Sequence, residues 1–190
     1  MGNLFIAFGT PLYRGHLIVL LALVLCAAIY DARYRRIPNW LTAGGVLVGI
    51  ALNTFLFPGL SGLWFSLRGL AIGFAIYLVM HLLRAMGAGD VKLMAAVGSI
   101  VGAGNWFLIF LITAMLGGIL ALIVSIVKGR LRKTLFNVGF IVSEMQHLRP
   151  AYLKNEELDV RSDKGVRMPH GVVIAMGTLV FLAQLSRTLK

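Results

Sequence analysis

Two aspartates stand apart from the other acidic residues of this sequence. Only seven Asp and Glu residues occur among 190, and five of them fall within residues 128–168. The other two are Asp31, which closes the first apolar run, and Asp90, which ends a Gly-Ala-Gly-Asp tetrapeptide. An acid in or beside an apolar segment is costly to bury, so both are candidates for a functional role.

Two carboxylates that meet at one site can share a single proton, because ionising both at short distance is unfavourable. The ionised group can take a proton from a water molecule while the protonated group donates to a peptide carbonyl oxygen. This is the chemistry of an aspartic peptidase, and it needs neither a metal nor another cofactor. Asp31 and Asp90 are therefore a candidate catalytic pair, and we expect no metal site and no cofactor.

Each aspartate also has a structural interpretation. Asp31 could pair with Arg33, Arg35 or Arg36 at the end of a helix. Asp90 could be the N-cap of the helix that follows it, a position where Asp is favoured. The residue pattern alone leaves these alternatives open.

The elements that must position the pair are membrane helices. The chain is 59% hydrophobic and 13% charged, whereas about a quarter of the residues in a soluble domain are charged. Six apolar runs occupy residues 15–30, 37–57, 68–84, 91–103, 105–127 and 168–186. We predict one all-α, polytopic membrane domain over residues 1–190, with about six transmembrane helices.

The loop charges favour six spans and orient them. Residues 93–127 carry no charge, and we expect a turn there at Gly102, Gly104 and Asn105. With the N-terminus outside, 14 of the 18 Lys and Arg fall in inner loops, in line with the positive-inside tendency. Two spans separate the aspartates, so we expect both at the cytoplasmic face of the inner membrane. We assign the net charge of +11 to loops beside anionic lipid, not to nucleic-acid binding.

Residues 128–168 form the one sizeable loop, on the cytoplasmic side in this topology. Apolar residues recur in it at helical spacing after a cluster of cations, which predicts either a helix in the headgroup region or a helix packed on the rest of the protein. Cys26 is the only cysteine, which excludes an intramolecular disulfide and a CxxC zinc site.

The motifs around the aspartates resemble those of the type IV prepilin peptidase family, the GxGD aspartic peptidases. The matching segments are Asp31-Ala32-Arg33 with Ile37-Pro38-Asn39, then Gly87-Ala88-Gly89-Asp90-Val91-Lys92-Leu93, and Met168-Pro169-His170-Gly171. The resemblance extends from about residue 17 to 186. It implies a peptidase of the bilayer that uses Asp31 and Asp90 to cleave the short leader of prepilins or pseudopilins.

Five further residues are expected around the pair. Gly87 and Gly89 permit unusual backbone angles and close approach of another chain, such as a substrate strand. Pro38 and Asn39 should begin the second helix and position the loop after Asp31. Lys92 could neutralise Asp90 or an acidic group of the substrate, or could simply face lipid.

The chain departs from the larger members of that family. Those carry a cytoplasmic insert with paired CxxC motifs that is associated with N-methylation, and here the loop after Asp31 is short. The short form resembles the peptidases of tight-adherence (Flp) pilus systems and is similar to archaeal preflagellin peptidases. We therefore expect no methyltransferase activity. The role of His170 is open, and we expect His81 to be structural.

Two other functional classes fit a small polytopic chain. A transporter that uses both acids as proton or cation sites would place them near the bilayer midplane and show an inverted repeat. A non-catalytic assembly factor of a pilus machine would keep the spans without needing both acids. No repeat is visible, and both acids fall at the ends of apolar runs.

Overall fold

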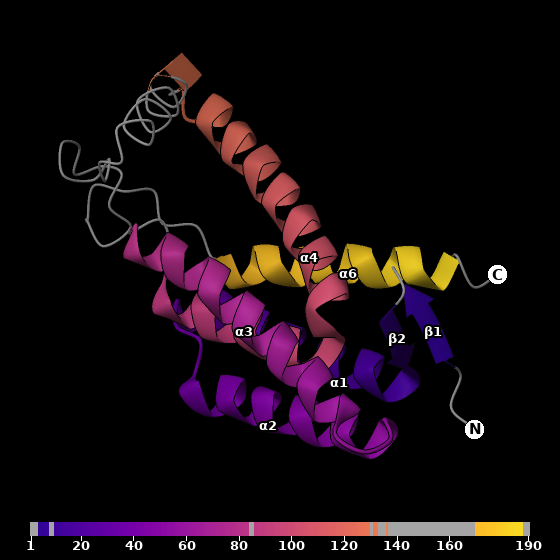
Figure 1. The fold of residues 1–190 in the computed structure, drawn as a ribbon. Coiled ribbons are helices and arrows are strands. Elements are labelled where there is room, and N and C mark those ends of the chain that lie inside the picture. Colours follow the sequence, from indigo (N-terminus) through magenta and orange to yellow (C-terminus); the bar gives the residue numbers. More distant parts are fainter. Residues whose placement is uncertain are drawn as a thin grey trace.

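The computed structural model describes residues 4–7, 10–83, 86–129, 131, 132, 136 and 170–187. The described part is dominated by helices, which follow a short hairpin (Figure 1). The strands are β1 (Leu4–Ala7) and β2 (Thr10–Tyr13), antiparallel with Leu4 opposite Tyr13. The helices are α1 (Arg14–Tyr34), α2 (Asn39–Leu56), α3 (Ser61–Leu82), α4 (Ala88–Val127) and α6 (His170–Arg187).

Four helices, α1 to α4, are long and apolar enough to cross a membrane, and α6 is a shorter apolar helix. The prediction of an all-α membrane fold is thus confirmed, with the N-terminal hairpin as an unpredicted addition. The third helix begins before the apolar run at residues 68–84 that the sequence predicts. Helix α3 begins at Ser61, and the exposed Arg68 lies within it. The helix expected in residues 128–168 lies almost entirely outside the described residues.

Helix α4 contains the predicted interruption. At 40 residues a straight helix would be about 60 Å long, twice the roughly 30 Å hydrocarbon thickness of a bilayer. Gly102 breaks it with φ 73° and ψ 171°, whereas Gly104 and Asn105 are helical. The chain changes direction there, and the second segment leaves the other helices at an angle (Figure 1). Counting both segments, the described chain has the six apolar helical segments that the sequence predicted.

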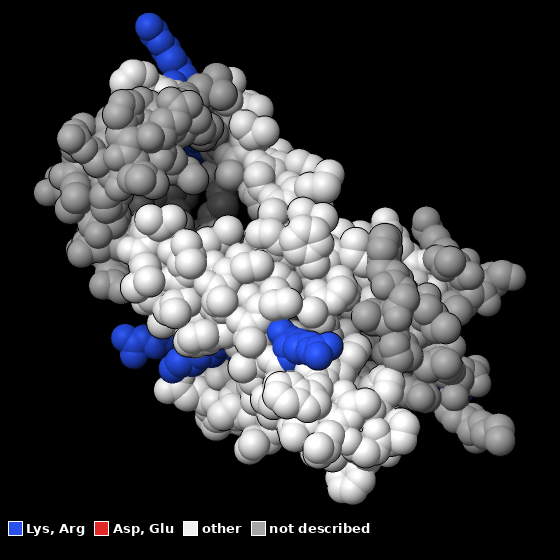
Figure 2. Space-filling model, viewed as in Figure 1, with Lys and Arg blue, Asp and Glu red and all other residues white. Residues whose placement is uncertain are grey.

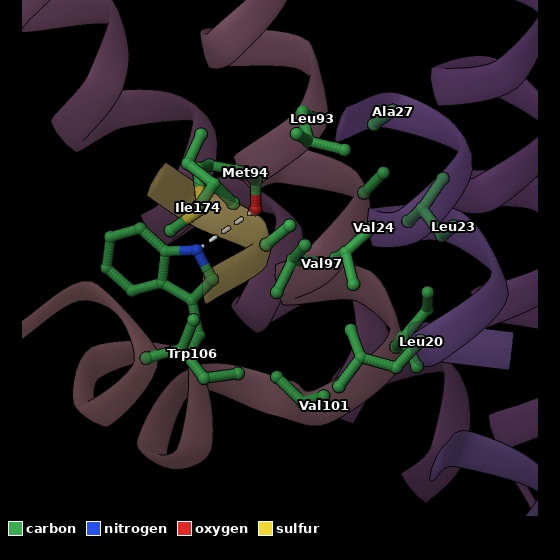
Figure 3. Packing of buried hydrophobic residues seen from close by; sticks show 14 of the residues in the cluster. Leu20, Leu23, Val24, Ala27, Leu93, Met94, Val97, Val101, Trp106 and Ile174 are labelled. Atoms are coloured by element: carbon green, nitrogen blue, oxygen red, sulfur yellow. Dashed lines mark hydrogen bonds between the residues drawn. The ribbon is translucent and has the colours of Figure 1, made fainter. Parts of the chain in front are cut away.

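The first segment of α4 is the centre of the fold. From Val91 to Val101 its side chains are buried, apart from the exposed Lys92, as expected for a helix that is apolar on all sides. Leu20 and Val24 of α1 face Val97 and Val101 in the core cluster (Figure 3).

Two contacts hold this segment in place. The Trp106 indole, from beyond the break, donates to the Met94 carbonyl at 3.0 Å. On the other side, α3 crosses α4 where Gly69 meets Gly98, and a Cβ on either glycine would overlap the backbone of the other. Small residues let membrane helices approach this closely.

Candidate active site

Asp31 lies in the last turns of α1, where its side chain is 8% exposed. The Gly171 N–H, at the start of α6, donates to Asp31 Oδ2 at 2.7 Å. This bond joins two helices that are 140 residues apart in sequence. A Cβ on residue 171 would lie 2.9 Å from both Cβ and Oδ2 of Asp31, which is too close for any other residue without a shift. Sequence reasoning had not assigned Gly171 a role, although its Pro-His-Gly motif had been singled out.

Asp90 lies in the first turn of α4 and is 7% exposed. Its Oδ2 accepts a hydrogen bond from the Gly87 N–H at 3.2 Å. Gly87 is the N-cap residue, so Asp90 is the third residue inside the helix, not the N-cap that the structural alternative supposed. A carboxylate in the first turn is favoured by the positive end of the helix dipole.

The two loops that carry these motifs touch each other. A Cβ on Gly89 would lie 3.3 Å from the Ile37 Cβ, so the glycine permits the close approach of the α1–α2 loop. Gly87 has an ordinary φ of −76°, and neither Gly87 nor Gly89 has a positive φ. The expectation that these glycines supply unusual backbone angles is therefore wrong, and close packing is the reason for Gly89.

One open pocket, about 490 Å³ in volume, contains both aspartates. It lies between the α1–α2 loop and the start of α4. Its lining residues are Asp31, Arg35, Arg36, Ile37, Pro38, Asn39, Gly87, Ala88, Gly89, Asp90 and Lys92. All seven residues proposed from the sequence for the site therefore line one pocket.

Pro38 and Asn39 stand where the sequence placed them. Pro38 is the N-cap residue and Asn39 the first residue of α2. Lys92 is exposed, and its ammonium donates to Asn39 Oδ1 at 2.8 Å. The bond links the first turn of α4 to the first turn of α2.

The arginines after Asp31 do not neutralise it. In the described part of the chain, none of Arg33, Arg35 and Arg36 makes an ion pair with Asp31, and all three are exposed. Arg33 lies over the Tyr34 ring, with Cζ 5.9 Å from the ring centroid. Arg35 ends α1 in the left-handed region, with φ 52°, and its N–H bonds to the Asp31 carbonyl at 2.8 Å. Such strain is uncommon outside glycine and recurs at functional sites.

Two histidines complete the surroundings of Asp90. Asp31, His170 and His81 all lie within electrostatic range of its carboxylate. His170 is the first residue of α6, and His81 ends α3 with Nδ1 2.9 Å from the Met86 carbonyl. The sequence interpretation missed this proximity of His81 to Asp90, although only the short connection from α3 to α4 lies between them in the sequence.

The described residues contain no group of three or more His, Cys, Asp or Glu side chains arranged to hold a metal ion. The pocket brings together two buried carboxylates and the exposed cations of its wall, and two imidazoles lie within electrostatic range of Asp90. Such a set can exchange protons with a bound water molecule and a polar substrate.

The chain is similar in sequence to known proteins. The model of the type IV leader peptidase family matches residues 18–122, more than half of the chain. A curated relative, "Prepilin leader peptidase/N-methyltransferase" of Myxococcus xanthus, is 29% identical over 121 residues. That match covers 60% of this chain but only 35% of the relative. No solved structure matches the chain.

Proposed function

Because the chain belongs to the type IV leader peptidase family, we propose that it is a membrane aspartic endopeptidase that removes the leader of prepilins or pseudopilins. One observation carries the aspartic mechanism. The only two acidic residues outside residues 128–168 are 59 positions apart in sequence, and both line one pocket as buried side chains.

The reaction follows from carboxylates held in this way. The pair shares one proton, and the ionised member takes a proton from water while the water oxygen attacks the scissile carbonyl carbon. The protonated member donates to the carbonyl oxygen, and a tetrahedral diol forms. The C–N bond then breaks as one carboxyl group gives its proton to the leaving amine nitrogen, while the other carboxylate takes a proton from a diol hydroxyl. That hydroxyl becomes the C=O of the new carboxyl group, and the pair again holds one proton. The Gly171 and Gly87 N–H groups hold the carboxylates in place through this cycle.

The position of the acids in their helices fits a substrate cut at the membrane surface. Asp31 is near the end of α1 and Asp90 is near the start of α4, and neither lies in the middle of a span as a midplane transport site would require. Exposed cations surround this end, at Arg33, Arg35, Arg36 and Lys92. We assign it to the cytoplasmic face of the inner membrane, with the N-terminus outside.

We propose peptidase activity without N-methylation. The name of the Myxococcus relative joins the two activities, and this chain aligns with about a third of that protein. The family's CxxC-bearing insert has no counterpart in the four residues between α1 and α2, and the single cysteine cannot form such a motif.

Co-expression with a prepilin that carries a short leader tests the proposal. Asp31→Asn and Asp90→Asn should each reduce leader removal by about 10³-fold or more, because a neutral amide cannot exchange the proton. Asp163→Asn, a matched change at one of the five acids of residues 128–168 that the proposed mechanism does not use, should process normally. Normal processing by either pocket variant, at equal levels in the membrane, would rule out the aspartic mechanism.

A further inference from the structure

A second pocket, the α2–α3 groove, opens beside the candidate active site. It has a volume of about 420 Å³ and lies between α2 and α3, with the first segment of α4 as its floor. Its lining residues are Asn39, Thr42, Ala43 and Val46 of α2, Leu70 and Phe74 of α3, and Lys92 and Ala95 of α4. The α2 residues are spaced by three and four positions, so they form one face of that helix.

The groove is continuous with the pocket that holds the acids. Asn39 and Lys92 line both, and the 2.8 Å hydrogen bond between them lies where the two spaces meet. Both side chains are exposed. The Lys92 ammonium retains two further N–H donors beyond this bond. A peptide passing from one space to the other would meet these polar groups at the boundary.

Away from that boundary the groove is apolar. Thr42 is buried and its hydroxyl donates to the Asn39 carbonyl at 3.1 Å, so its one O–H donor is already used. Val46, Leu70 and Phe74 supply the walls, and the small Ala95 side chain leaves room above the floor. Within a bilayer, such a groove suits an apolar helix or strand laid between two helices. The volume is within the ~300–1,000 Å³ typical of ligand pockets.

The surrounding surface suits a partner that arrives through lipid. On the face shown in Figure 2 the described surface is mostly uncharged, with a few basic side chains and no acidic side chain. Phe74 is 43% exposed and Val46 is half-buried, so the groove walls face outward.

We propose that the α2–α3 groove binds the apolar segment that follows the scissile bond of the substrate. The proposal rests on the proposed peptidase function. The cut then falls at Asp31 and Asp90, just before the substrate passes the Asn39–Lys92 bridge into the groove. The leader lies on the side of the acids that faces away from the bridge. The bridge can bond to peptide groups of a chain that is extended at this point, because a helix would leave few of them free.

Cross-linking tests the position directly. Val46 and Val48 form a matched pair on α2, since Val46 lines the groove and Val48, 46% exposed, does not. Each is changed to Cys in a chain carrying Cys26→Ser and Asp90→Asn, and single cysteines are placed along the apolar segment of a prepilin. We expect oxidative cross-links to Val46→Cys at substrate positions near the cut, and few to Val48→Cys. Equal cross-linking at both would mean that the groove faces only lipid, which would overturn the proposal.

Filling the groove gives a second readout in the active chain. Val46→Trp should slow leader removal roughly tenfold or more, since the bulk competes with the substrate segment, whereas Val48→Trp should not. The amount of folded Val46→Trp in the membrane and its thermal unfolding in detergent, beside those of the parent, show whether the fold tolerates a change at this site. Equal rates for both Trp variants would overturn the groove assignment and leave the peptidase intact. If Asp90→Asn still processed the substrate, the peptidase mechanism would fail instead, and the cross-links would remain readable.

Discussion

Two polar clusters lie at opposite ends of the same helices, and they are built differently. The far cluster centres on Asn53, near the end of α2, whose Oδ1 is 2.8 Å from His16 Nε2. Its amide nitrogen donates within 2.9–3.0 Å to Ser66 Oγ and the Ser99 carbonyl. His16, Asn53, Ser66 and Ser99 are all 0% exposed.

The end that holds the two aspartates is built in another way. Asp31 and Asp90 are also buried, but each carboxylate receives one backbone N–H and faces an open pocket. A buried polar group with its hydrogen bonds satisfied stabilises helix association, while a buried carboxylate that faces open space keeps lone pairs free to accept a proton. The far cluster thus links α1, α2, α3 and α4 by hydrogen bonds. These helices in turn position Asp31 and Asp90 at the other end.

The largest difference is expected on replacing the two aspartates of the proposed active site. Asp31→Asn and Asp90→Asn should lose about 10³-fold or more in cleavage without lowering the melting temperature, because two buried acids in one place destabilise a fold. Thermal unfolding in detergent, beside the cleavage assay, checks this. A clear fall in melting temperature for both variants would show that the acids are structural.

Gly171→Ala should have the next largest effect. The added methyl group would press on Asp31 and displace the carboxylate from its N–H donor. Misplacement of a catalytic group by about 1 Å can cost roughly 10²-fold in rate. Gly118→Ala, where the Cβ meets nothing within 4 Å, is the control and should cleave normally. The measurement is the cleavage rate at matched membrane levels.

Asn53→Ala should show the reverse signature. Removing the central amide leaves His16, Ser66 and the Ser99 carbonyl with fewer partners, at a cost of about 1–3 kcal/mol in the free energy of unfolding. Protein that remains folded should still cleave. Thr54→Ala, which removes an exposed hydroxyl bonded to its own helix, should change stability little. Lost activity with unchanged stability in Asn53→Ala would contradict the division of roles.

Lys92→Met should give the smallest effect. The substitution keeps the length of the side chain and removes its exposed bond to Asn39, which is worth on the order of 1 kcal/mol or less. We expect a several-fold fall in cleavage and no measurable change in stability. A loss as large as that of Asp90→Asn would instead make Lys92 part of the catalytic group.

The two clusters also differ in how far the sequence alone predicts them. Both aspartates were found from the sequence because an acid in an apolar chain is rare and because their flanking residues carry a pattern. The Asn53 cluster was not found. Its members are single polar residues on four different helices, and no spacing rule links them until the helices are packed.

By itself, the sequence determined that this chain is a membrane protein, that it has about six apolar helical segments, and that Asp31 and Asp90 lie on the same side. Composition, run length and parity of crossings decide these points locally, because lipid forces each apolar run into a helix. Only the tertiary structure decided which groups surround the acids. The Gly171 N–H donates to Asp31, which is 140 residues away in the sequence. The break at Gly102 divides α4, so its first segment can be buried on all sides while the second runs in another direction. Such contacts depend on how the helices cross, and close packing at pairs such as Gly69 and Gly98 sets those crossings.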